Sequence, residues 1–168
     1  MTLDQFWSLI DNVHRDSNGD MEEKCRLLEA ELRRLPLDEV LSFHEHFTDC
    51  LDRAYSWPLW AAAYIMGGGC SDDSFWDFRS TLISMGRGTY ERAMADPETL
   101  AELNLASGDE MQWEGYQYVP SRVESALSGG REFPRVRPHP KEPSGKAWAE
   151  ERVADLYPKL AQRYGYAA

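Results

Sequence analysis

The run WPLWAAAYIM at residues 57–66 places the strongest constraint on how this chain can fold. It is apolar nearly all round, so a helix made from it must be covered by other elements on every side. Pro58 fits the first turn of such a helix, and three glycines follow its end at residues 67–69. The run has about half of the ~20 residues that a membrane-spanning helix needs. We therefore predict a helix from Leu59 to Met66 at the centre of a folded core.

Amphipathic helix patterns precede this run. Thr2 and Gln5 have the spacing of a capping box, and Asp20 with Glu23 marks a second helix start after the break at residues 17–20. The apolar faces that follow are Met21, Cys25, Leu28, Leu32 and Leu35, and then Val40, Phe43, Phe47, Leu51 and Ala54. Each set recurs at steps of three and four residues, which is typical of helices that pack on a core.

Helix signals also follow the glycines. We predict a helix over residues 72–85 that closes at Gly86, and another start at Asp96 with Pro97 in the first position. Residues 105–119 stay open between loop, short strand and helix, and residues 120–130 read as a short helix with a glycine stop. The predicted fold class is all-α, a compact single-domain bundle of about six to eight helices.

Composition divides the chain into three parts. A helical core should cover residues 1–130, because residues 131–146 contain four prolines and five basic residues against two acids. This strap should be extended and have no core of its own. Its simplest role is to lie along the acidic body and deliver a C-terminal helix, residues 147–168, to its packing site, and a strap that binds a partner is the alternative. Ser144 is the predicted cap of that helix, Pro158 its bend and Gly165 its end.

Charge excludes several functional classes. The chain has 168 residues, 42% of them hydrophobic, and a net charge of −11, which disfavours nucleic acid and anionic membranes as partners.

The N-terminus lacks the basic flank and apolar core of a signal peptide. Cysteines at 25, 50 and 70 have no paired spacing, so we expect neither disulfides nor a zinc knuckle. We therefore expect the protein to be cytoplasmic.

Histidines offer little support for a metal site. His46 and Cys50 share a helix face at a four-residue spacing, but no second ligand pair accompanies them. We expect no metal and no cofactor.

The stretch GGGCSDDSFWDFR at residues 67–79 is the most informative one for function. On a helical projection Arg79 falls inside the arc of Phe75, Phe78, Leu82 and Met85, with Trp76 on its flank. An unpaired guanidinium there would cost several kcal/mol, so we predict a buried arginine held by Asp72 or by an acid of a neighbouring helix. A structural ion pair and a grip on a ligand's carboxylate or phosphate both remain open.

The residues before Arg79 allow several interpretations. The glycines precede a helix as in a phosphate loop, but no Walker lysine follows, so they more simply end the buried helix. Cys70 stands before a helix N-terminus, which favours thiolate, while Asp72 and Asp73 oppose it. Trp60 and Tyr64 lie one turn apart and are predicted to form the wall against which the 72–85 helix lies.

These residues, in this order, resemble a known family. FWSLID, LSFHEHF, the block from Arg53 to Leu103 and a tryptophan-bearing C-terminal helix are similar to the bacterial family named domain of unknown function 4240. The likeness covers residues 3–130 and implies a compact, cytoplasmic single domain of a type common in actinobacteria. It implies no activity or cofactor. The matching positions are Trp60, Gly68, Cys70, Ser71, Asp72, Asp73, Phe75, Phe78, Arg79 and Gly86. The chain departs from the family at Pro36, where the family pattern tends to place a serine-type helix cap.

Three functions fit these features. The first is a non-catalytic binding or regulatory module that takes an anionic small molecule or a peptide carboxylate. Its predicted ligand-binding residues are Arg79, Ser71, Trp60, Tyr64 and Gly68. The second is a hydrolase or transferase with Asp72 or Asp73 as general base, Cys70 as a further catalytic candidate and Arg79 as anion anchor. The third is an acidic interaction protein for a basic partner, in the manner of an immunity protein. An enzyme needs an open cleft and an unpaired carboxylate near Arg79, whereas an interaction protein needs neither.

Overall fold

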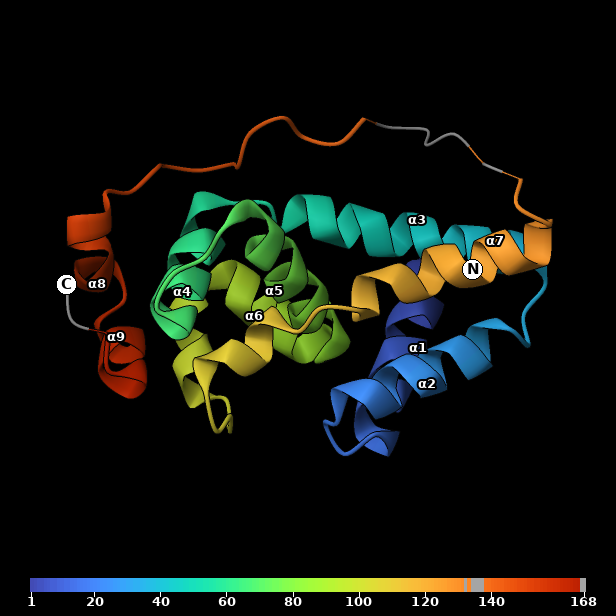
Figure 1. Cartoon of the computed structure of the whole chain (residues 1–168), viewed down its shortest axis with the longest axis horizontal. Coiled ribbons are helices and arrows are strands. Elements are labelled where there is room, and N and C mark those ends of the chain that lie inside the picture. Colours follow the sequence, from blue (N-terminus) through green and yellow to red (C-terminus); the bar gives the residue numbers. More distant parts are fainter. Residues whose placement is uncertain (132, 134–137, 167–168) are drawn as a thin grey trace.

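Nine α-helices and four 3₁₀ helices form the described part of the chain (Figure 1). The computed structural model describes residues 1–131, 133 and 138–166, except the side chain of Asp109. The α-helices are α1 (Leu3–Asp16), α2 (Met21–Leu32), α3 (Leu37–Arg53), α4 (Trp57–Gly67), α5 (Asp72–Ser84), α6 (Arg87–Ala95), α7 (Val119–Ser128), α8 (Val153–Leu156) and α9 (Pro158–Tyr164). The 3₁₀ helices are η1 (Pro97–Glu102), η2 (Gly108–Gln112), η3 (Tyr116–Tyr118) and η4 (Glu150–Arg152). These residues contain no strand, and the all-α prediction is confirmed.

Helix α4 lies inside the molecule, as its composition requires. Its buried residues are Leu59, Ala61, Ala62, Ala63, Ile65 and Met66. Helices α5, α8, α9, η1 and η2 pack around it, and Figure 1 shows it between the C-terminal helices and α5. Small alanine side chains in its middle allow this close approach from several directions.

The predicted starts of the first two helices are confirmed. Thr2 and Gln5 form the complete capping box of α1, and the Asp20 carboxylate accepts from the Glu23 backbone N–H at 2.7 Å. Pro36 precedes α3 and provides no side-chain cap. The start of this helix is stabilised instead by the acidic residues of its first turn and by the packing of its buried face.

Helix α6 was not predicted, because its cap comes from a distant part of the chain. The segment after Gly86 carries no capping side chain of its own, and Gly86 adopts φ +91°. Asp11 in α1 supplies the missing acceptor, receiving the backbone N–H of Arg87 at 2.9 Å. A tertiary contact thus replaces the local signal that Ser, Thr or Asp would give.

The ambiguous residues 105–119 contain two short 3₁₀ helices. Gly108 packs against the end of α4 so closely that a β-carbon built on it would lie 1.8 Å from the Met66 carbonyl oxygen. Gln112 donates to the carbonyls of Ala63 at 3.4 Å and Gly69 at 3.2 Å. This segment therefore covers the end of α4 and supplies hydrogen bonds there.

The C-terminal region differs from the predicted single helix. Ser144 is not a helix cap: it forms an isolated bridge with Ser56, and the first helical residue after it is Glu150. The helix breaks at Tyr157, before Pro158, and ends at Gly165 with φ 65°, as predicted. Part of the predicted strap, residues 132 and 134–137, lies outside the described residues. The rest of it, from residue 138, contains no helix.

Over the described ranges, we find no helix with both the length and the apolar character required to cross a bilayer.

Substituting Gly108 tests the close approach to α4. We expect Gly108→Ala to lower the free energy of unfolding by ~1–3 kcal/mol, because the new methyl group meets the Met66 backbone. Gly88→Ala in α6 is the matched control, since nothing lies within 4 Å of its added β-carbon. It should be neutral or stabilising by up to ~1 kcal/mol in the same urea titration. Equal effects of the two changes would contradict the packing described here.

Candidate functional site

Arg79 is buried, as predicted, with 6% of its surface exposed. Its Nη1 donates to the Leu51 carbonyl at 2.8 Å, and its Nε donates to the Phe75 carbonyl at 3.2 Å. The guanidinium carbon also lies over three rings, those of Tyr55 at 4.7 Å, Phe75 at 4.9 Å and Trp76 at 5.5 Å. No described carboxylate lies within ion-pair distance of it. The predicted ion pair with Asp72 is therefore wrong.

The physical reason lies at the C-terminal end of α3. Carbonyls in the last turn of a helix have no partner within the helix, and that end attracts positive charge. Arg79 caps the Leu51 carbonyl there, while the Tyr90 hydroxyl donates to the Cys50 carbonyl at 2.8 Å. Burial lowers the pKa of Arg79 to about 10, and the charges of Tyr55 and Asp52 partly oppose this effect. Asp72 instead stays exposed in the first turn of α5.

The glycine loop is a joint between α4 and α5. Gly68 ends α4 in the left-handed conformation with φ 65°, and the Gly69 N–H donates to the Tyr64 carbonyl at 2.9 Å. Ser71 begins α5 as its N-cap, its hydroxyl accepting from the Ser74 N–H at 3.2 Å. Both roles follow from ordinary helix termination and capping.

Trp60 and Cys70 belong to the same joint. The Trp60 indole donates to the Cys70 carbonyl at 3.0 Å, and its ring stacks on Phe75 of α5 at 4.8 Å. Burial raises the pKa of the Cys70 thiol to about 12, with Asp72 and Asp77 adding to the effect and Arg79 opposing it. The thiol therefore stays protonated at neutral pH and has little nucleophilic character.

Tyr64 faces the C-terminal part of the chain rather than α5. Its ring contacts Trp148 at 5.1 Å and Tyr166 at 6.0 Å, both edge to face. A hydrogen bond with Glu150 raises its pKa to about 12, and burial adds to this effect. Only Trp60 of the predicted pair thus forms a wall for α5.

An acidic–aromatic surface covers the outer side of α5. Trp76, predicted on the apolar flank, is 42% exposed, and Asp73 and Asp77 lie one turn before it and next to it on the helix. Burial raises the pKa of Asp77, the Gln117 amide opposes this by hydrogen bonding, and the negative charges of Glu114 and Asp73 add to it. We name Asp52, Asp73, Trp76, Asp77 and Glu114 the acidic–aromatic surface. Asp52, from α3, joins it through the contact described next.

His139 contacts this surface from the strap. Its Nδ1 lies 2.8 Å from the Asp52 carboxylate, and its ring centroid lies 6.2 Å from that of Trp76. This residue thus brings one point of the strap next to acidic groups of α3 and α5. The sequence did not single out Trp76, Asp52 or His139, because no local pattern brings residues from three separate segments together.

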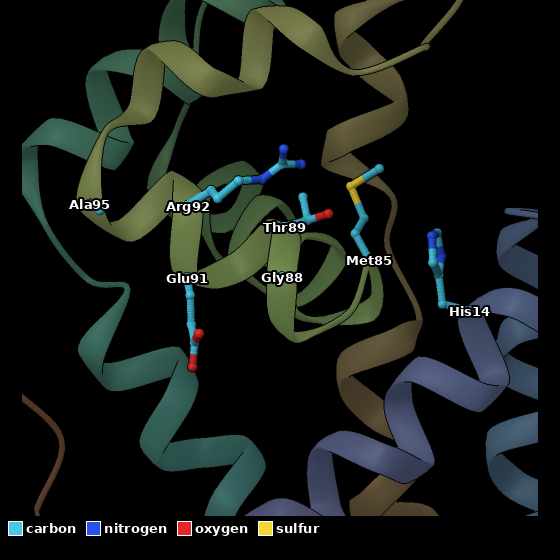
Figure 2. Close-up of a pocket in the computed structure, with 7 residues that line it drawn as sticks. All are labelled: His14, Met85, Gly88, Thr89, Glu91, Arg92 and Ala95. Carbon is cyan, nitrogen blue, oxygen red and sulfur yellow. The ribbon is translucent and has the colours of Figure 1, made fainter.

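A shallow hollow of about 630 Å³ lies between α1 and α6 (Figure 2). His14 and Met85 lie at one side of it, while Thr89 and Arg92 of α6 border it, and Glu91 points away from them in the view. Arg92 is 3.9 Å from Glu102, so one of its faces is already near a carboxylate.

Lys24 is a buried cation that the sequence reading missed. It is 1% exposed, and its Nζ donates to the Ser84 hydroxyl at 3.1 Å, its one hydrogen bond among the described residues. Burial lowers its pKa to about 8, and burial together with the Lys24 charge also lowers the pKa of His14. The signal was its position, three residues after Met21 and four before Leu28 on the apolar face of α2.

No group of three or more His, Cys, Asp or Glu side chains suited to a metal occurs within the described ranges. His46 instead uses Nε2 for the Met1 carbonyl at 3.1 Å, and Cys50 is buried.

These observations define an all-helical domain with an apolar central helix, a buried arginine that caps a neighbouring helix, and an acidic–aromatic surface outside it. The chain belongs to the family described as Protein of unknown function (DUF4240), whose sequence model matches residues 1–123. No curated protein and no solved structure matches the chain. The matched region ends within α7, so the strap and the C-terminal helices lie beyond it.

Substituting Arg79 tests its capping role. We expect Arg79→Met to lower the free energy of unfolding by ~1–3 kcal/mol, because the Leu51 carbonyl loses its side-chain donor in a buried site. Asp72→Asn should cost under ~1 kcal/mol, the value of a charge at a helix N-terminus. The coupling between the two changes should stay below ~0.5 kcal/mol in urea unfolding of the double mutant. Strong coupling between the two changes would instead indicate that Asp72 and Arg79 interact directly.

The buried charge of Lys24 gives a pH-dependent prediction. Its pKa of about 8 in the folded chain lies below the ordinary 10.5, so the unfolded chain binds more protons between these pH values. The unfolding free energy of the wild type relative to Lys24→Met should therefore rise with pH across this window, by up to ~3 kcal/mol. Urea titrations of both proteins at pH 7 and pH 10 measure the difference, in which the cysteine and tyrosine titrations largely cancel. A difference that does not change with pH would show that Lys24 titrates normally.

Proposed function

We propose that this chain is a non-catalytic interaction module that binds a basic, extended segment of a partner protein on the acidic–aromatic surface. The observation that carries this proposal is the exposed Trp76 between carboxylates, with the basic side chain His139 next to it.

The chemistry of the surface favours a cationic partner. A Lys or Arg side chain gains from lying over an exposed aromatic face and from carboxylates at its edge. Asp73, one turn before Trp76, provides a carboxylate on the same side of α5, and Asp77 and Glu114 add negative charge close by. The net charge of −11 attracts a basic segment from a distance and repels acidic ones.

The chain's own strap supports the extended form of the partner. Residues 138–146 contain no helix, and within them His139 reaches both Asp52 and Trp76 of this surface. Prolines at 138, 140 and 143 favour an extended backbone, which loses little entropy when it binds. A partner segment of similar composition would meet the same groups.

The other two functions gain less support from the geometry. A ligand-binding pocket or an enzyme site at the glycine loop both use Arg79 as an anion anchor. Its hydrogen bonds to two carbonyls and its three ring contacts would have to be displaced by the anion. Asp72 and Asp73, the proposed bases, are exposed, and the Cys70 thiol is protonated at neutral pH.

We also assign the module to the cytoplasm. Cys25, Cys50 and Cys70 are all free thiols, which suits a reducing compartment.

Binding of a fluorescein-labelled peptide that alternates proline and arginine tests the proposal. We expect saturable binding in fluorescence anisotropy that weakens as salt is added, and a loss of affinity of about tenfold for Trp76→Ala. Asp73→Asn with Asp77→Asn should weaken binding further. Trp76 also lies near Arg79, so circular dichroism must show that each variant is folded.

The matched control is Leu127→Ala, which removes an apolar side chain of similar exposure, 40%, from α7. It should leave the affinity unchanged, and a proline–glutamate peptide should not bind. Equal affinity of wild type and Trp76→Ala for the arginine peptide would reject this surface as the binding site.

A further inference from the structure

The C-terminal arm, defined as residues 143–166, covers one side of α4. Helices α8 and α9 pack against α4, and α9 also packs against η1. In Figure 1 the arm lies at the opposite end of the molecule from α7, the helix from which the chain leads to it. The arm also lies outside the family-matched residues 1–123. It therefore docks at a distance from its point of attachment to the core.

Two kinds of contact hold the first half of the arm. The Ser144 N–H donates to the Tyr55 carbonyl at 3.0 Å, and the Trp57 N–H donates to the Ser144 carbonyl at 2.9 Å. The Trp148 indole donates to the Trp57 carbonyl at 2.9 Å, and its ring meets the Tyr64 ring edge to face. Together they fix both the register and the depth at which the arm docks.

The second half of the arm adds an apolar anchor. Val153 and Leu160 are fully buried. The Lys159 N–H donates to the Glu98 carboxylate at 2.6 Å, and Arg163 donates to the Leu105 carbonyl at 3.1 Å. Exposed side chains of the arm, such as Leu156 at 50%, point away from this contact.

The segment that leads into the arm, which we call the approach, is exposed to solvent, unlike the docked arm. Residues 138–142 are all exposed, and they link the arm to the rest of the chain without helical structure. None of the docking contacts depends on which copy of the chain supplies the arm. A cover on this side of α4 is favourable, because the helix is apolar nearly all round and its other sides already pack against α5, η1 and η2.

We propose that the arm-facing side of α4 is an exchangeable docking site, and that the arm of a second copy of this chain occupies it in trans. The result is a dimer in which each copy donates its arm to the other. The closed monomer dominates at low concentration, because tethering keeps the chain's own arm at a high effective concentration. Exchange of an identical element needs no new interface, so it is a low-cost route to a dimer.

Shortening the approach to the arm tests this directly. Deleting residues 138–142 removes ~17 Å of extended reach, so the arm should no longer reach its own α4. We expect the full chain with this deletion to be a dimer by size-exclusion chromatography with light scattering. The backbone amides of α4 should stay protected from hydrogen exchange. A folded monomer with the arm docked, or one with α4 unprotected, would overturn the proposal.

A second measurement covers the case in which the deleted chain does not fold. Leu160→Asp should undock the arm of the full chain, which would then bind a labelled synthetic peptide of residues 143–166 about tenfold more tightly than the wild type does. Leu156→Asp is the matched control on the same arm, since Leu156 is exposed, and it should behave as the wild type. Absence of peptide binding to Leu160→Asp rejects docking in trans. This site is separate from the acidic–aromatic surface, so either proposal can fail without the other.

Discussion

The capping of α3 by side chains from α5 and α6 is the interaction on which the arrangement of the helices depends. The Leu51 carbonyl at this end accepts from the Arg79 guanidinium, and the Cys50 carbonyl accepts from the Tyr90 hydroxyl as well as from the Ala54 N–H at 3.0 Å. The two donors fix both helices against the same end of α3. Arg79 can be buried there because its charge meets the negative end of the helix dipole and the faces of aromatic rings. The position that looked most like a ligand anchor is therefore part of the framework.

The aromatic side chains extend this framework to the C-terminal arm. Trp60 stacks on Phe75 at 4.8 Å and on Trp57 at 5.4 Å, and Trp57 meets Trp148 edge to face at 6.3 Å. Aromatic pairs of this kind add to the energy of burial and restrict the relative orientation of the elements that carry them. The glycine loop lies beside this series, and Trp60 and Gln112 use its carbonyls as acceptors. The carbonyls of Gly69 and Cys70 are thus engaged in hydrogen bonds within the chain.

Two buried cations in an acidic protein give the functional interpretation its electrostatic basis. Lys24 and Arg79 are 1% and 6% exposed, and neither has a described carboxylate within ion-pair distance. Both groups are withdrawn from contact with solvent, whereas no described Asp or Glu side chain is buried, so the exposed charged groups are more strongly acidic than the composition alone implies. On such an exterior an exposed tryptophan between aspartates offers a basic segment both charge and an aromatic face. This combination favours an interaction module over an anion-binding site.

The sequence by itself determined the elements whose signals are local. Spacing and residue type were enough to predict the apolar run of α4, the capping residues Thr2 and Asp20, the stop at Gly165 and the burial of Arg79. The family was also recognised from the sequence. The tertiary structure alone decided the partners. Arg79 bonds to a carbonyl of α3 rather than to Asp72, Asp11 caps α6 from a distant helix, and Ser144 pairs with Ser56 instead of starting a helix. Periodicity predicts which side of a helix is buried, but the identity of the group that meets a buried side chain depends on how segments far apart in the chain pack together.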